Sequence, residues 1–177
     1  MNFLKLFLVA TLLVLTAGLL YADEGDTADD IVVPAMDSIK IYQDSLFKII
    51  NKSFESVKPI LVNSCYDCHS NATVEPWYFD LPIISGFVKG HVEHARKNLD
   101  FSDGFPFTGG SKNDQLHLLH EIKEEIEKGD MPILSYRIMH WGKLIEGDKQ
   151  DSLFTWIDNT TAELKKFYDE YGISYKD

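Results

Sequence analysis

Cys65-Tyr66-Asp67-Cys68-His69 is the most informative segment of this sequence, because it holds both cysteines of the chain and a histidine directly after them. This spacing puts both sulfurs within reach of the two vinyl groups of a porphyrin, where they can form thioether bonds. The same helical turn then brings His69 beneath the iron, and imidazole is a good iron ligand. The segment therefore predicts one covalently attached haem, heme c, held by Cys65 and Cys68 with His69 as an axial ligand.

Two other kinds of chemistry are open to a pair of neighbouring cysteines. In an oxidising compartment the pair could form a local disulfide, and a thioredoxin-like redox pair is expected after a β-strand in a βαβ setting. A zinc site is expected to have two further ligands at suitable spacing. Neither setting is visible in the sequence, so haem attachment is favoured, with disulfide or metal chemistry as the alternative.

The N-terminus has the pattern of an export signal. Lys5 precedes an apolar run from Leu6 to Leu20, and Tyr21-Ala22 stands before an acidic stretch. We predict that residues 1–22 are a signal peptide. An uncleaved anchor is the alternative, because the run lies near the upper length limit for a signal peptide, although it is shorter than the roughly 20 apolar residues of a comfortable membrane span. The protein is then periplasmic, and it is either soluble or attached to the membrane only through its N-terminus.

Composition and charge limit the class of protein. Of the 177 residues, 45% are hydrophobic, which is enough for one compact domain with a core. The net charge of −11 at pH 7 argues against nucleic-acid binding. The same charge would favour redox partner proteins with basic docking surfaces, or it could simply keep an exported protein soluble.

The distribution of apolar residues predicts an all-α fold, a single small helical domain with long loops wrapped around the haem. The acidic residues 23–36 suggest a flexible leader, and residues 37–177 are expected to form the c-type haem-binding domain. Apolar residues recur at helical spacing in four stretches: 37–57, 83–99, the stretch from a cap at Ser111 or Asn113 to Lys128, and 148–171.

Three shorter features complete the expected fold. Pro59 disturbs the first helix or begins a new one, and Asn63 or Ser64 can cap a short helix that carries the two cysteines. The stretch 103–110 is rich in turn residues and apolar at once. It is therefore expected to fold onto a hydrophobic surface, for which the haem face is a candidate.

The sequence also resembles the haem-binding domain family of small exported bacterial c-type cytochromes. The resemblance covers roughly residues 57–157, and it implies haem binding and electron transfer. It is carried by these motifs in order: Cys65 to Asn71 with Thr73, Pro76-Trp77-Tyr78, Pro82, Arg96 with Asn98-Leu99-Asp100-Phe101-Ser102, Gly129-Asp130-Met131-Pro132, Tyr136, His140 and Trp156.

Met131 is the predicted second axial ligand of the iron. It follows a helix stop at Gly129, and Pro132 would stiffen the loop that presents its sulfur. Packing in the protein core is the alternative role for this methionine, and His140 is the competing ligand, with Met139 a weaker one. Methionine opposite histidine gives a higher reduction potential, whereas two histidines usually give a lower one.

Three further residues are predicted to contact the cofactor. Arg96 could pair with a haem propionate through its planar guanidinium, which the resemblance supports, or it could be a solvated helix charge. Trp77 and Tyr78 could cover the haem edge, or they could belong to the ordinary core. The remaining histidines are expected to lie at the surface or half-buried: His91, His94, His117 and His120.

The sequence thus predicts a monohaem cytochrome that transfers electrons between partner proteins in the periplasm. No catalytic residue is expected. One alternative is a five-coordinate haem enzyme or sensor acting on peroxide or a diatomic gas, which an open sixth position would favour. Another is a haem subunit of a larger membrane-associated respiratory complex, which an uncleaved N-terminal anchor would favour.

Overall fold

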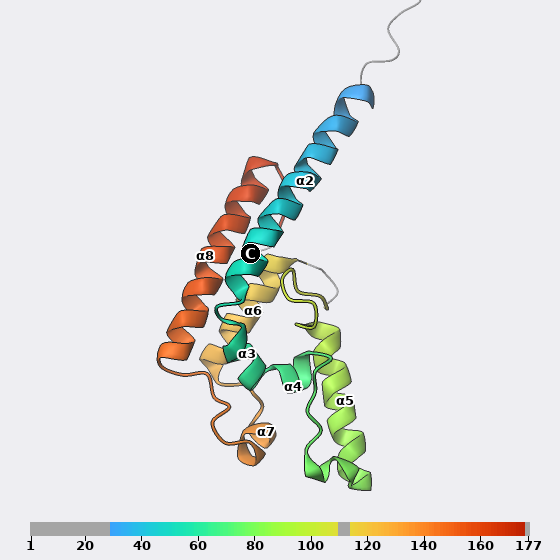
Figure 1. Cartoon of the computed structure of the whole chain (residues 1–177), viewed down its shortest axis with the longest axis vertical. Coiled ribbons are helices and arrows are strands. Elements are labelled where there is room, and N and C mark those ends of the chain that lie inside the picture. The colour runs from blue at the N-terminus through green and yellow to red at the C-terminus, as the bar shows by residue number, and fades with distance from the viewer. Residues whose placement is uncertain (1–28, 110–113, 176–177) are drawn as a thin grey trace, which may run out of the picture. The chain divides into compact units, whose positions relative to one another are not determined.

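The computed structural model describes residues 29–109 and 114–175, with side chains from residue 36 onward. Within these residues the protein is all-α, as predicted, and a single isolated bridge between Asp100 and Thr108 is the only β-type pairing. The predicted signal peptide, residues 23–28 of the leader, and Ser111 and Asn113 lie outside the described residues. The elements are α2 (Asp29–Phe54), α3 (Lys58–Ser64), α4 (Tyr66–His69), the 3-10 helix η1 (Trp77–Asp80), α5 (Pro82–Asn98), α6 (Gln115–Lys128), α7 (Leu134–Met139) and α8 (Asp148–Glu170) (Figure 1).

The chain divides into two parts, Met1–Tyr42 and Gln43–Asp177, and α2 runs through the boundary. The helix begins at Asp29 and not near residue 37, so residues 29–36 are helical where the sequence suggested a flexible leader. All buried hydrophobic side chains among the described residues belong to the second part. None of the described helices has the length and apolar character needed to cross a membrane.

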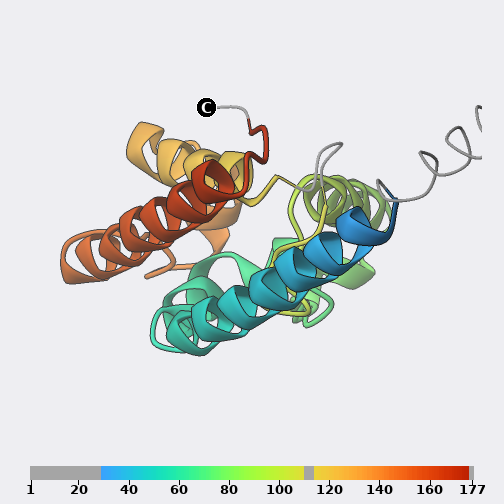
Figure 2. The same cartoon turned by 90° about the horizontal axis from the view of Figure 1, so that it is seen from above.

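The core of residues 43–177 is aromatic. Phe54 of α2 packs edge-on against Phe107 and tilted against Trp156 of α8, with ring centroids 5.4 Å apart in both pairs. The indole N–H of Trp156 donates a hydrogen bond to the Ser53 hydroxyl at 3.0 Å. Edge-on aromatic pairs stabilise a fold beyond the area they bury. Two helices far apart in the sequence are therefore joined directly, while α6 lies alongside α8 (Figure 2).

The turn-rich stretch 103–110 folds onto a hydrophobic surface, as expected, but its two phenylalanines enter the protein core. Phe105 and Phe107 are almost fully buried, and Phe105 packs edge-on against Phe47 with ring centroids 5.5 Å apart. The amide side chain of Gln115 accepts from the N–H of Phe107 (2.8 Å) and donates to its carbonyl (2.9 Å). Both side chains are therefore buried against other aromatic residues of the chain, and contact of this loop with the haem face stays a prediction.

The C-terminal ends of the last two long helices lie where the sequence predicted them, to within one residue. α6 stops at Lys128, and Gly129 takes the left-handed conformation (φ +73°) that glycine adopts without strain. Its N-terminal cap is Asp114, whose carboxylate accepts from the N–H of Leu116, so the prediction of Ser111 or Asn113 as the cap was wrong. α8 buries five of the six side chains that its periodicity placed inward, whereas Tyr171, just past the end of the helix, is only half-buried. The five buried side chains are Leu153, Trp156, Ile157, Leu164 and Phe167.

Candidate functional site

The two cysteines lie at the junction of α3 and α4. Pro59 stands in the first turn of α3, so it begins a new helix. Cys65 ends α3 and precedes α4, and its carbonyl accepts from the N–H groups of Cys68 (3.1 Å) and His69 (2.9 Å). One helical turn, residues 65–69, therefore carries both thiols and the imidazole, and we name it the attachment helix.

Cys65 and Cys68 are free thiols and partly buried. Burial raises the pKa of the Cys65 thiol to about 12, and burial also raises the pKa of the Cys68 thiol. A protonated thiol is a poor nucleophile, and the pair follows helix α3 where a thioredoxin-like pair would follow a strand. Among the residues that the structure describes, no three His, Cys, Asp or Glu side chains gather in a way that could hold a metal ion.

The His69 ring is oriented by the backbone that follows α5. Its Nδ1 lies 2.9 Å from the Leu99 carbonyl, which can only accept, so Nδ1 carries the proton in the neutral ring. Burial lowers the pKa of the imidazole, against the opposing effect of the carbonyls of Leu99 and Ala95 and of the Asp100 carboxylate. In this tautomer Nε2 carries the lone pair, and an iron-binding histidine is commonly fixed by such a bond from its other nitrogen.

A second set of contacts holds the backbone of the attachment helix. The N–H of Phe101 donates to the His69 carbonyl at 2.7 Å. The Phe101 ring is stacked on that of Tyr66, with centroids 5.7 Å apart, and the Tyr66 hydroxyl donates to the Phe101 carbonyl. The buried Ser70 hydroxyl donates to the Tyr66 carbonyl at 2.8 Å. These contacts fix both ends of the turn that carries His69.

Arg96 pairs with a residue of its own chain. Its Nε donates to a carboxylate oxygen of Asp100 at 3.0 Å. Burial alone would raise the pKa of Asp100, but hydrogen bonds from Ser102 and from Arg96 outweigh burial and lower it. Among the described residues, Nε is the only part of the guanidinium that makes a hydrogen bond. The terminal nitrogens of Arg96 thus remain available to a carboxylate such as a propionate.

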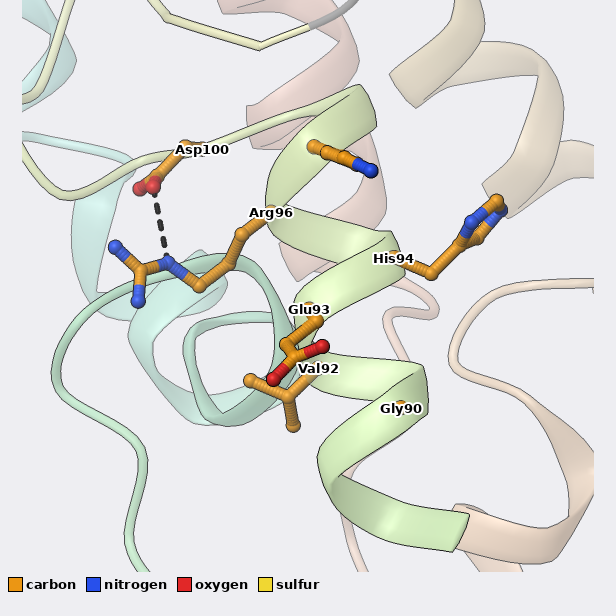
Figure 3. A pocket seen from close by; sticks show the side chains of 7 residues that line it. Gly90, Val92, Glu93, His94, Arg96 and Asp100 are labelled. Atoms are coloured by element: carbon orange, nitrogen blue, oxygen red, sulfur yellow. Dashed lines mark hydrogen bonds and ion pairs between the residues drawn. The ribbon is translucent and has the colours of Figure 1, made fainter. Parts of the chain in front are cut away.

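Figure 3 shows this ion pair beside an open hollow of about 700 Å³ on the C-terminal half of α5. Most of the side chains that line the hollow are polar or charged. A surface of this kind suits the carboxylate-bearing edge of a haem better than its apolar face. The lining residues are Gly90, Val92, Glu93, His94, Arg96, Lys97 and Asp100.

The other predicted haem contacts lie in and after η1. The Trp77 side chain is 80% exposed and packs edge-on against Tyr78. The Tyr78 hydroxyl lies 3.4 Å from Nε2 of His140, so the structure brings these two predicted residues together. The four remaining histidines are exposed, as expected: His91, His94, His117 and His120.

Met131 lies between α6 and α7, and its N–H donates to the Glu125 carbonyl at 3.2 Å. Its side chain is 37% exposed, so it does not fill the protein core, which was the alternative to iron ligation. The peptide bond between Met131 and Pro132 is cis.

Sequence reasoning missed two direct links between α3 with the attachment helix on one side and α7 with the turn after it on the other. The Tyr136 hydroxyl donates to the Asp67 carboxylate, and the Asn63 side chain donates to the Gly142 carbonyl at 3.1 Å. The short helix α7 was not predicted at all. The one available signal was the spacing of Tyr136 and His140, which places them on the same helix face.

The elements around the attachment helix expose many large apolar side chains. Neither α5 nor α7 contains a buried residue among those described. Exposed apolar side chains can be covered by an apolar ligand that binds over them. A porphyrin is a broad apolar disc with two carboxylates, so these residues, together with the two thiols, His69 and Arg96, fit a haem. The exposed side chains include Trp77, Ile83, Phe87, Leu134, Ile138, Met139 and Trp141.

Comparison with known proteins agrees with this fit. A sequence model of a haem-binding domain family matches residues 31–159, which is well over half of the chain. No curated protein and no solved structure matches it. The matched range includes the attachment helix, α5, α7 and the first half of α8. The chain belongs to the haem-binding domain family.

Proposed function

We propose that this protein is a monohaem c-type cytochrome that transfers single electrons between partner proteins in the periplasm. The observation that carries the proposal is the His69 ring, whose Nδ1 is bound to the Leu99 carbonyl within one helical turn of two free thiols. Membership of a haem-binding family supports it. When bound, haem supplies an iron that gains and loses one electron.

The predicted site residues would each bind a different part of the haem. Cys65 and Cys68 would hold the cofactor by thioether bonds, and His69 would bind the iron in the orientation that Leu99 imposes. Met131 would be the second axial ligand. Arg96 would bind a propionate through its terminal nitrogens, while Trp77 and Tyr78 would cover the haem edge.

The proposed export and choice of partners rest on features of the sequence. Residues 1–22 would direct the chain to the periplasm, where it is either soluble or attached by an uncleaved N-terminal anchor. The net charge of −11 would steer redox partners with basic docking surfaces. Association that is rapid at low ionic strength and slows as salt is added would support this steering.

A second candidate function is a five-coordinate haem sensor or enzyme acting on peroxide or a diatomic gas. Two observations favour it. Met131 is exposed, so its sulfur is free to move away from an iron, and both ring nitrogens of His140 have partners within the chain. An iron with neither side chain as its ligand would keep its sixth position open. Rapid carbon monoxide binding to the reduced protein would select this function over electron transfer. Membrane association that resists salt and disappears on deletion of residues 1–22 would indicate a subunit of a respiratory complex.

The deciding experiment is mass spectrometry of the exported protein from a host that attaches haem. One haem added to the peptide that contains residues 65–69 is expected, and the Cys65→Ala, Cys68→Ala variant serves as control. Optical spectra of the oxidised and reduced forms then report the ligands. A wild-type peptide without added porphyrin would falsify the proposal.

A further inference from the structure

Four polar side chains join α7 and the residue after it to the attachment helix and to η1, and we name them the clasp: Asp67, Tyr78, Tyr136 and His140. Asp67 lies between the two cysteines and accepts from the Tyr136 hydroxyl through Oδ2. Its other oxygen accepts from the N–H of Val74 at 3.2 Å. The ammonium group of Lys143 lies 3.9 Å from the same Oδ2. One carboxylate of the attachment segment therefore receives bonds from two other parts of the chain.

Both ring nitrogens of His140 are used inside the clasp. Nδ1 lies 3.0 Å from the Tyr136 carbonyl, which can only accept, so Nδ1 donates. In the neutral ring Nε2 then has no proton, and it accepts from the Tyr78 hydroxyl at 3.4 Å. The His140 ring is also stacked on the Tyr136 ring, with centroids 4.1 Å apart. An imidazole held in this way would have to give up its contact with Tyr78 before Nε2 could bind an iron.

The Tyr136 hydroxyl keeps its proton, so it can donate a hydrogen bond. Burial and the hydrogen bond to Asp67 both raise the pKa of this phenol above its ordinary value. The group stays protonated at physiological pH, and a hydrogen bond to a carboxylate is among the stronger ones in proteins.

We propose that the clasp holds the segment of residues 131–143 against the attachment helix, and that His140 is a positioning residue in it and not the sixth iron ligand. This inference rests on the proposed function, because it concerns how the chain presents Met131 to the haem. The clasp connects Asp67, fixed by its neighbours Cys65 and Cys68, to the short helix that follows Met131. A loose α7 would leave the sulfur of Met131 free to move away from the iron.

The first test is hydrogen exchange of the haem-loaded protein, read by mass spectrometry. In Tyr136→Phe the amides of residues 131–143 are expected to exchange roughly tenfold faster, because one charge-assisted hydrogen bond is lost. Tyr175→Phe is the matched control, since Tyr175 makes the same kind of bond to Asp169 at 3.1 Å outside the clasp. Tyr78→Phe tests the other end of the clasp if Tyr136→Phe folds poorly.

The second test identifies the iron ligands directly by near-infrared magnetic circular dichroism of the oxidised wild type. A histidine–methionine signature is expected, and it is expected to weaken in Tyr136→Phe while Tyr175→Phe retains it. A bis-histidine signature that disappears in His140→Ala would overturn the inference. Unchanged exchange of residues 131–143 in both Tyr136→Phe and Tyr78→Phe would also overturn it.

The two proposals fail in different ways. Absence of porphyrin from the cysteine peptide contradicts the proposed function. With porphyrin attached, the ligand spectrum and the exchange rates bear on the clasp alone.

Discussion

The aromatic core of this protein buries its large apolar side chains, whereas the helices beside the attachment helix leave theirs exposed. In the core, α6 and α8 together bury a dozen side chains, and the loop phenylalanines fill the space between them and α2. Beside the attachment helix, α5 and α7 have no buried residue among those described, although both carry large apolar side chains. The core is therefore formed by the chain's own residues, whereas the proposed haem would cover apolar side chains that α5 and α7 leave exposed.

Removing the attachment thiols tests this contrast most severely. The variant Cys65→Ala, Cys68→Ala is expected to lose all covalently bound haem. Amides of α5 and α7 should then exchange roughly tenfold faster or more, because a group that binds only the folded state stabilises it, while α8 keeps its protection. Hydrogen exchange by mass spectrometry measures both effects.

The wild-type chain produced without haem attachment is the control for that variant, since it lacks the cofactor but retains both thiols. It should show the same pattern. Equal protection of the α5 amides with and without haem would show that the fold around the attachment helix does not depend on the cofactor.

Two phenylalanines sharpen the comparison at the level of single side chains. Phe54→Ala is expected to lower the free energy of unfolding by about 3 to 5 kcal/mol, because Phe54 is fully buried against two aromatic rings. Phe87→Ala in the haem-free chain should change it by less than about 0.5 kcal/mol, since its side chain is 59% exposed. Urea denaturation followed by far-UV circular dichroism gives both values.

In the haem-loaded protein the Phe87→Ala cost is expected to rise, because the cofactor would cover this side chain. A Phe87→Ala cost that is the same in both forms would place the haem elsewhere than beside α5.

A smaller effect is expected at Asp100, whose carboxylate binds Arg96 of α5 and Ser102 of the loop that follows α5. Asp100→Asn should cost about 1 to 2 kcal/mol at pH 7, because it weakens the hydrogen bonds from Ser102 and Arg96 to a charged acceptor. The pKa of Asp100 is lowered in the folded state, so the carboxylate stabilises the fold above its ordinary pKa of 3.8. That contribution is lost as the pH falls through the folded value.

Stability measured by urea denaturation from pH 7 down to about pH 2 should therefore fall less steeply in Asp100→Asn than in the wild type, below about pH 4. Asp103→Asn, a change in the neighbouring loop, is the matched control. Parallel curves for Asp100→Asn and wild type would show that this carboxylate has no special role.

Much of the helical fold could be predicted, for reasons visible in particular residues. Leu153, Trp156 and Leu164 recur at helical spacing and are buried in α8, because that periodicity is itself the signal of one covered face. Gly129 ends α6 as predicted, since a left-handed residue is needed there. Helix α7 was missed because it is short and buries none of its residues.

Some features of the candidate site could likewise be predicted from the sequence, and others could not. The amino-acid sequence by itself determined the two thiols and the imidazole on one turn, because neighbours along a helix are set by the backbone alone. Only the tertiary structure decided that Leu99, 30 residues away, orients the His69 ring and that Tyr136, 69 residues away, binds Asp67. It also decided that Phe105 and Phe107 enter the aromatic core. Contacts over such separations depend on which helices pack together, and no local pattern of residues specifies that choice.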